Sequence, residues 1–114
     1  MNNKTFDYTC FGHTYGNCRF EVNRYGNNNL AIEIVNDEEG EIATVTVNMG
    51  NKLTDDRICV KTWSENRDMN NFLKIYGFVE REDIGFLDNG SIRAPVMKLT
   101  AKGKEYLGLD KMQK

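Results

Sequence analysis

Short runs in which every second residue is apolar, each closed by a turn rich in glycine or asparagine, constrain the fold of this 114-residue chain more than any other feature. The first four runs cover residues 4–11, 15–22, 29–37 and 41–49. Side chains of a β-strand point alternately to the two faces of its sheet, so this period marks strands with one buried face. The spacing of the runs predicts an antiparallel β-meander.

One antiparallel register places the apolar side chains of all four runs on the same face. The opposite face then carries polar residues such as Glu21, Glu33 and Thr46. This register needs a loop at residues 25–29 and turns at residues 12–14 and 37–40. Because a slip of one residue would exchange the two faces, the agreement between three hairpins favours it. The predicted pairs are Phe6–Phe20, Tyr8–Cys18, Cys10–Gly16, Phe20–Ile34, Val22–Ile32, Leu30–Val47, Ile32–Val45 and Ile34–Ala43.

The period changes after a fifth predicted strand at residues 57–63. Apolar residues then follow at i, i+3, i+4 and i+7 from Met69, which predicts a helix with one apolar stripe. Thr62 and Glu65 have the spacing of a capping box at its start, and Gly77 suits its C-terminal cap. We expect this helix to cover the apolar face of the sheet.

Two further runs, residues 77–87 and 91–99, flank an Asn-Gly pair, which is a strong hairpin signal. Pro95 has no N–H to donate, so its strand is expected to lie at a sheet edge or to break there. Thr100 is the expected cap of a short last helix. The sequence therefore predicts one α+β domain over residues 1–109, followed by a frayed tail at 110–114. Its fold is a curved antiparallel meander sheet, with one main helix packed on its apolar face and a short C-terminal helix.

The segment TCFGHTYGNC, residues 9–18, brings two of the three cysteines close to the only histidine. In the predicted hairpin Cys10 and Cys18 point to the core, whereas His13 lies at the tip. A zinc site usually needs four ligands, and a cysteine nucleophile needs a base within hydrogen-bond reach. The chain also lacks the GxxxxGK and GxGxxG phosphate-binding patterns. We therefore expect a protein that is not an enzyme and has no metal site and no cofactor.

Four carboxylates stand at the predicted turn between the third and fourth strands. A charged hairpin turn is often only a solvated surface. The functional alternative is an acidic tip that mimics nucleic-acid phosphates or binds a basic partner surface. Acid–base catalysis by paired carboxylates needs a cleft, which a hairpin tip does not supply. The four residues are Asp37, Glu38, Glu39 and Glu41.

A second candidate site combines aromatic and basic residues from separate segments. Tyr25, Lys61, Trp63 and Arg93 are predicted to form a pocket for a planar anionic ligand such as a nucleotide. The alternative is that Trp63 packs against the helix.

The charge and the chain start favour a cytoplasmic protein. The net charge is −2, and a protein that binds duplex DNA normally carries a stronger basic surface. No run approaches the ~20 apolar residues of a membrane span, and residues 1–11 lack the apolar core of a signal peptide. Three cysteines do not make a disulfide framework, which fits a reducing compartment. We expect no membrane partner.

The order of four motifs resembles a known family. The motifs are G-x-x-Y at residues 12–15, YGNNNLAIEI at 25–34, ATVTVNM at 43–49 and a strand that ends in KTWSEN at 61–66. This order is similar to that of a family of small uncharacterised proteins carried by conjugative elements and phages of Gram-positive gut bacteria. Two segments depart from the family pattern, because KTWSEN replaces DTNN and APV at 94–96 replaces YPL.

The resemblance implies a protein borne by a mobile element, and small accessory proteins of such elements often antagonise host defence. We therefore expect non-catalytic binding of a host defence protein, such as a CRISPR effector, in the cytoplasm of the bacterial host. One alternative is a homo-oligomer that sequesters a nucleotide immune signal. Another is a DNA-binding accessory regulator of the mobile element.

Overall fold

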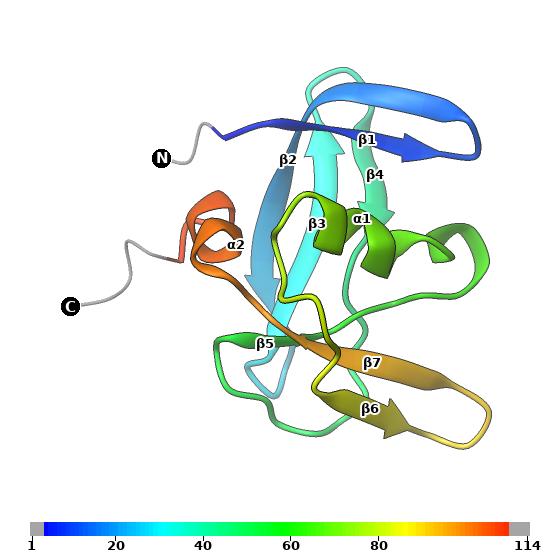
Figure 1. Ribbon diagram of the computed structural model, residues 1–114, viewed down its shortest axis with the longest axis vertical. Helices are drawn as coiled ribbons and strands as arrows, with labels where there is room; N and C mark the ends of the chain where they lie inside the picture. The colour runs from blue at the N-terminus through cyan, green and yellow to red at the C-terminus, as the bar shows by residue number, and fades with distance from the viewer. Residues whose placement is uncertain (1–3, 110–114) are drawn as a thin grey trace.

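Two antiparallel sheets and two short helices form the fold in the computed structural model, which describes residues 4–109 (Figure 1). The first sheet has the strand order β1-β2-β3-β4 and the second has the order β5-β7-β6. This confirms an α+β fold with a meander over the first four strands. The predicted frayed tail, residues 110–114, lies outside the described residues. The strands and helices are β1 (Phe6–Cys10), β2 (His13–Arg24), β3 (Leu30–Asn36), β4 (Gly40–Thr44), β5 (Arg57–Cys59), α1 (Met69–Ile75), β6 (Gly85–Asp88), β7 (Arg93–Lys98) and α2 (Ala101–Tyr106).

The centre of the first sheet has the predicted register. In β2 and β3, Phe20 pairs with Ile34 and Val22 with Ile32, and the loop between them is residues 25–29 as expected. In β3 and β4, Ile34 pairs with Ala43. All of these side chains except the half-buried Val22 are buried, so burial of one face selects the register.

The first hairpin differs from the prediction. Its turn is Phe11 and Gly12, whose φ values are 53° and 77°, and Cys10 therefore pairs with His13 rather than with Gly16. A two-residue turn with two positive φ values matches the right-handed twist of the flanking strands. The predicted three-residue turn did not take this match into account. A bulge then brings Phe6 opposite Cys18, so the predicted Phe6–Phe20 and Tyr8–Cys18 pairs are wrong. Phe6 still contacts Phe20, with ring centroids 4.6 Å apart.

The chain forms two sheets where a single sheet was predicted. Val45 N–H still donates to Ile32 O of β3 (2.8 Å), as the predicted Ile32–Val45 pair requires. The backbone then leaves β3 and pairs with the strand that includes β5: Val47 N–H donates to Cys59 O (3.0 Å), and Thr46 bridges to Val60. The predicted pair of Leu30 with Val47 is therefore wrong. Thr46, expected on the polar face, is 2% exposed, and its Oγ1 accepts a hydrogen bond from Ile32 N–H (3.0 Å).

Pro95 lies in β7, the middle strand of the second sheet, and the prediction of an edge strand is wrong. The reason is the direction in which its backbone points. Pro95 O accepts a hydrogen bond from Val60 N–H (3.0 Å), so its nitrogen also faces the β5 side. Pro95 stands opposite Val60, just beyond the last regular pair of β5, so the proline costs only the return hydrogen bond to Val60 O at the end of this ladder.

The main helix is shorter than predicted. A 3₁₀ turn at Ser64–Asn66 precedes α1, and neither start has a side-chain cap, so the capping box of Thr62 and Glu65 is wrong. The C-terminal cap at Gly77 is confirmed: its φ is 78°, and Phe78 N–H donates to Leu73 O (2.9 Å). None of the helices within residues 4–109 is long and apolar enough to cross a membrane.

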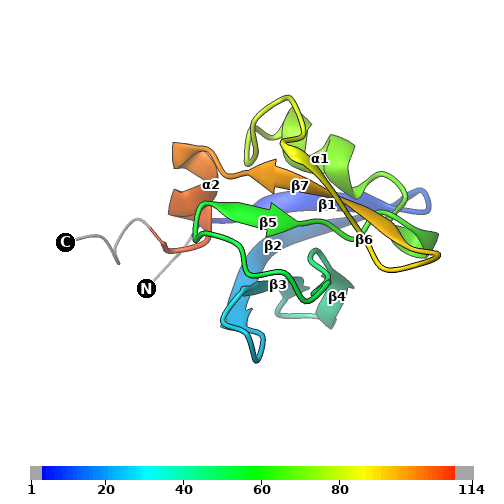
Figure 2. The same cartoon turned by 90° about the horizontal axis from the view of Figure 1, so that it is seen from below.

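The main core lies between the two sheets and the helices. Figure 2 shows the second sheet, α1 and α2 on one side of strands β2, β3 and β4. Helix α1 contributes Met69 and Leu73 to this core, and its Phe72 ring lies 4.9 Å from the Tyr8 ring of β1. The prediction that Thr100 caps the last helix is confirmed, since its side chain accepts a hydrogen bond from Gly103 N–H (3.0 Å).

Candidate functional site

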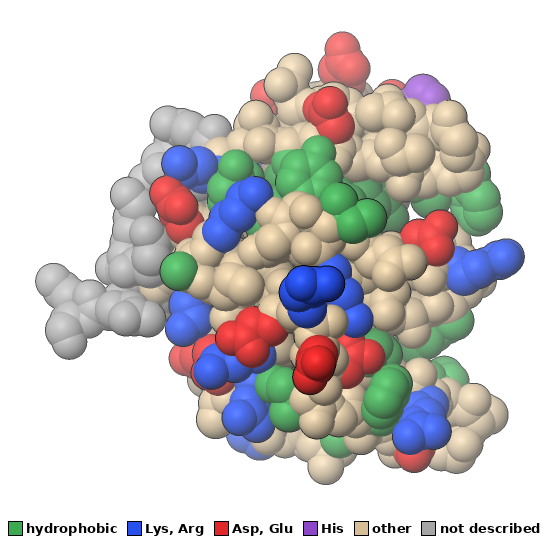
Figure 3. All heavy atoms as spheres, in the orientation of Figure 1, with side chains coloured by type: hydrophobic (Ala, Val, Ile, Leu, Met, Phe, Trp, Pro, Cys, Tyr) green, Lys and Arg blue, Asp and Glu red, His purple; other side chains and the backbone are tan. Residues whose placement is uncertain are grey.

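The turn between β3 and β4 presents the predicted acidic residues to solvent. We call Asp37, Glu38, Glu39 and Glu41 the acidic turn, and all four are exposed. The buried Asn36 holds its backbone in place: its Oδ1 accepts a hydrogen bond from Glu39 N–H (2.7 Å). Acidic side chains therefore project from the top of the molecule in Figure 3, where Figure 1 places this turn.

Most of the charge of the acidic turn is not neutralised within the described part of the chain. Asp37 accepts a hydrogen bond from Arg19 at 2.9 Å, with 91% of its side chain exposed. Glu38, Glu39 and Glu41 form no ion pair with any residue from 4 to 109. An exposed Asp–Arg pair is weak, so the turn keeps a negative potential.

Two further carboxylates extend this negative potential along the outer face of the first sheet. Glu21 of β2 pairs with Glu33 of β3 across the strands. The pKa of Glu33 is raised, first by desolvation, then by the charge of Glu41, and next by that of Glu21. The predicted register places Glu21 and Glu33 on this face. The sequence did not indicate that Glu33 lies close enough to Glu41 to join these two carboxylates to the acidic turn.

A hollow of about 240 Å³ adjoins the acidic turn. It is lined by Gly16 and Asn17 of β2 and by Asn36, Asp37 and Glu38. Asn36 Nδ2 donates to Gly16 O (3.4 Å), which ties the two hairpins together at this place. Since its lining is rich in carbonyl and carboxylate oxygens, the hollow favours a cationic side chain over an anion.

The four residues of the predicted ligand pocket make their contacts elsewhere. The Tyr25 hydroxyl lies 3.1 Å from Thr46 Oγ1, and Lys61 Nζ lies 3.1 Å from the Glu65 carboxylate. Trp63 packs on a small second core of Cys59, Ala94 and Val96 rather than on α1. The Arg93 guanidinium lies over the Phe86 ring, 4.5 Å from its centroid. None of these contacts links one of the four side chains to another. The pocket therefore remains a prediction.

The three cysteines have different surroundings. Cys18 and Cys59 are buried, and burial raises the pKa of both thiols, that of Cys59 to about 11. Cys10 is only half-buried, and its Sγ donates to Glu65 O (3.6 Å). His13 is an exposed strand residue beside the turn, with its ring 4.4 Å from that of Tyr15. No group of three His, Cys, Asp or Glu among residues 4–109 has the arrangement of a metal site.

A second hollow, of about 340 Å³, lies between the β1–β2 turn and the 3₁₀ turn. Its lining includes Cys10, Phe11, Glu65 and Arg67. The sequence did not predict this hollow. Residues 9–12 and 64–68 are far apart in the chain, and the loop after β5 brings them together. Its charges are mixed, so it favours no single class of ligand.

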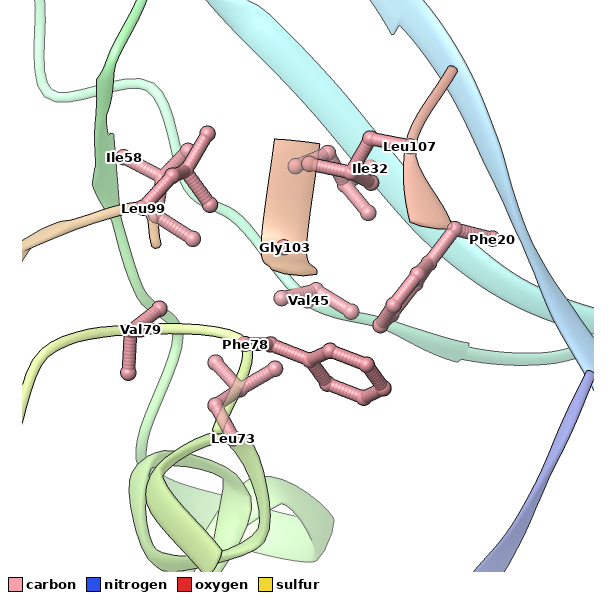
Figure 4. Close-up of a pocket in the computed structure, with 10 residues that line it drawn as sticks. All are labelled: Phe20, Ile32, Val45, Ile58, Leu73, Phe78, Val79, Leu99, Gly103 and Leu107. Carbon is pink, nitrogen blue, oxygen red and sulfur yellow. The ribbon is translucent and has the colours of Figure 1, made fainter. Parts of the chain in front are cut away.

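A small cavity lies in the core, drawn in Figure 4 between the sheets and α2. Its volume is about 10 Å³, and apolar side chains such as Phe20, Ile32 and Leu107 point into it. That volume is near the minimum for one water molecule, and an apolar lining leaves a water without partners. The cavity is therefore a packing defect and not a ligand site.

The acidic turn, with Glu21, Glu33 and the hollow beside it, is the strongest candidate site in the described chain. Comparisons with models of protein families, with curated proteins and with solved structures found no significant match.

Proposed function

We propose that this protein is a non-catalytic inhibitor that binds a host defence protein through the acidic turn, as an accessory protein of a phage or another mobile element. The observation that carries the proposal is the exposed charge of Glu38, Glu39 and Glu41, which no basic residue between 4 and 109 neutralises. A CRISPR effector, or another defence protein that binds nucleic acid, keeps a Lys/Arg surface for phosphates. The acidic turn offers carboxylates to the same surface.

The geometry supports a protein partner better than the alternatives. A nucleotide sponge needs free cationic and aromatic groups, whereas Lys61 is paired with Glu65 and Trp63 packs on the second core. An anionic ligand would also be repelled by the acidic turn, and so would DNA. The resemblance to a family borne by mobile elements supplies the biological context of the proposal.

Capture from a bacterial lysate tests the proposal with a matched pair of variants. The double variant Glu38→Gln/Glu39→Gln removes charge at the acidic turn. Its control, Glu80→Gln/Glu82→Gln, removes the same charge from two exposed residues elsewhere. We expect wild type and control to retain a basic host protein that high salt releases, and the acidic-turn variant to lose it.

Two other outcomes would contradict the proposal. Equal capture by both double variants would show that the acidic turn is not the binding surface. Retention of a nucleotide that is lost in Arg93→Ala, with no protein retained, would assign the sponge function instead.

A further inference from the structure

Strands β4 and β6 are sheet edges whose outer sides pair with no other strand in the described part of the chain, and of these two it is β6 that exposes large apolar side chains. At the β1 edge, Asp7 N–H donates to the Tyr76 hydroxyl of the loop after α1 (3.3 Å). The strand after β4 is paired with the strand that includes β5, since Lys61 N–H donates to Val45 O (2.9 Å). Strand β6 forms the remaining edge of the second sheet, and nothing between residues 4 and 109 pairs with its outer side.

Strand β6 also exposes apolar side chains. Phe86 is 49% exposed and Ile84, just before the strand, is 44% exposed. Lysine and proline, two residues that prevent a sheet edge from pairing with another chain, are absent from Gly85–Asp88, and the only charge of this short strand is Asp88 at its end. A bulge at Ile84, whose N–H donates to Val96 O (2.8 Å), limits the regular part of the edge to the residues around Phe86.

The backbone of Phe86 points to the open side. Because Pro95 O accepts from Val60 N–H, the polar groups of Pro95 face β5, and those of its neighbours Ala94 and Val96 face β6. The ladder partners of these neighbours are Leu87 and Gly85, whose N–H and C=O groups therefore face β7. Phe86 lies between them, so its N–H and C=O are directed outward.

We propose that two copies of the chain associate through β6, paired antiparallel about a two-fold axis at Phe86. The outward N–H of each Phe86 donates to the C=O of the other, and the two sheets become one. Gly85 then faces Leu87 of the second copy, and Ile84 faces Asp88, so no like charges stand opposite one another.

The side chains around the axis favour the second copy as the occupant of this edge. The two Phe86 rings stand directly opposite on one face, and an aromatic pair across strands is stabilising. The Arg93 guanidinium lies over the Phe86 ring, 4.5 Å from its centroid, and Phe86 still keeps an exposed surface that a second copy can cover. The inner face of the joined sheet continues the second core through Leu87 and Ala94.

This association is independent of the proposed function. Figure 1 places β6 and the acidic turn at opposite ends of the molecule. The pair of copies therefore leaves both acidic turns exposed, and either proposal can fail while the other stands.

Sedimentation equilibrium of the full chain over a wide concentration range tests the proposal. We expect the wild type to form a dimer, and Phe86→Lys and Phe86→Glu each to weaken association by about tenfold or more. An equimolar mixture of the two variants should recover the lost affinity, because the axis sets residue 86 of one copy against residue 86 of the other. Phe11→Lys, which changes a phenylalanine that is 82% exposed at another turn, should associate like the wild type.

Hydrogen exchange of the wild type gives a readout that needs no variant. Exchange of the Phe86 amide should slow as the protein concentration rises. Three results would each overturn the proposal. They are a wild type that stays monomeric, a mixture of the two variants that associates no better than either variant alone, and a Phe86 amide whose exchange rate does not change with protein concentration.

Discussion

At the scale of single residues, the contact between α2 and the segment before β6 depends on one position without a side chain. A Cβ atom at Gly103 would lie 2.0 Å from the Phe78 carbonyl oxygen. Thr100 N–H donates to the same oxygen (3.1 Å), so the helix rests directly on this backbone. Only glycine allows so close an approach.

Gly103→Ala should therefore destabilise the protein by about 1–3 kcal/mol or more, because the helix must move away from Phe78. Denaturant unfolding followed by circular dichroism measures the change. Gly26→Ala is the control, since a Cβ there meets nothing within 4 Å. Equal stability of the two variants would mean that α2 does not pack as described.

Glu33 should make stability depend on pH. Its folded pKa is raised by desolvation, Glu41 and Glu21, whereas the unfolded chain titrates at the ordinary value. Between the two values the native state binds more protons than the unfolded state, so stability falls as pH rises through that interval. Glu33→Gln should flatten this fall and be more stable than the wild type at neutral pH. Unfolding at a series of pH values measures it, and an unchanged slope would contradict the described carboxylate cluster.

At the scale of elements, periodicity predicted the strands well where one face is simply buried. The pairs Phe20–Ile34 and Ile34–Ala43 follow from alternation alone, and so does the exposure of the acidic turn. The β1–β2 register depended instead on the positive φ of Phe11 in the turn. The periodicity of apolar residues gives no information on the φ of a turn residue. The edge position of Pro95 was wrong because a proline at the end of a ladder still accepts a hydrogen bond through its C=O, here from Val60 N–H, and costs the sheet only one bond.

The junction between the sheets depends on a residue that the pattern did not single out. Asn66 is fully buried, and its Nδ2 donates to Thr44 O and to Lys61 O, which joins the end of β4 to the strand that includes β5. Its place within KTWSEN gave no signal, because both partners are backbone carbonyls, which no residue type marks, and Thr44 is 22 positions away in the sequence.

Asn66→Ala should cost about 1–3 kcal/mol, because two carbonyls of half-buried residues lose their donor. The thermal midpoint should fall clearly, while Asn71→Ala, on the exposed face of α1, should change it little. A variant at position 66 as stable as the one at position 71 would show that the side chain does not join the sheets.

At the scale of the whole molecule, the charge and the open edge lie at different ends. The acidic turn stands at the end formed by the first sheet, and β6 stands at the other (Figure 1). The hairpin that carries the acidic turn also belongs to the best-predicted part of the fold. Partner binding at this turn did not follow from the sequence and stays a proposal, since a solvated hairpin turn exposes the same charge.

The most direct measurement of the central claim is the association rate constant with the captured host protein, taken over a range of salt concentrations. Charges at the rim of an interface act mainly on association and are screened by salt. The wild type and Glu80→Gln/Glu82→Gln should associate fast at low salt and several-fold more slowly at high salt. Glu38→Gln/Glu39→Gln should associate slowly, with a flatter salt dependence. The same rate and the same salt dependence in all three proteins would contradict binding through the acidic turn.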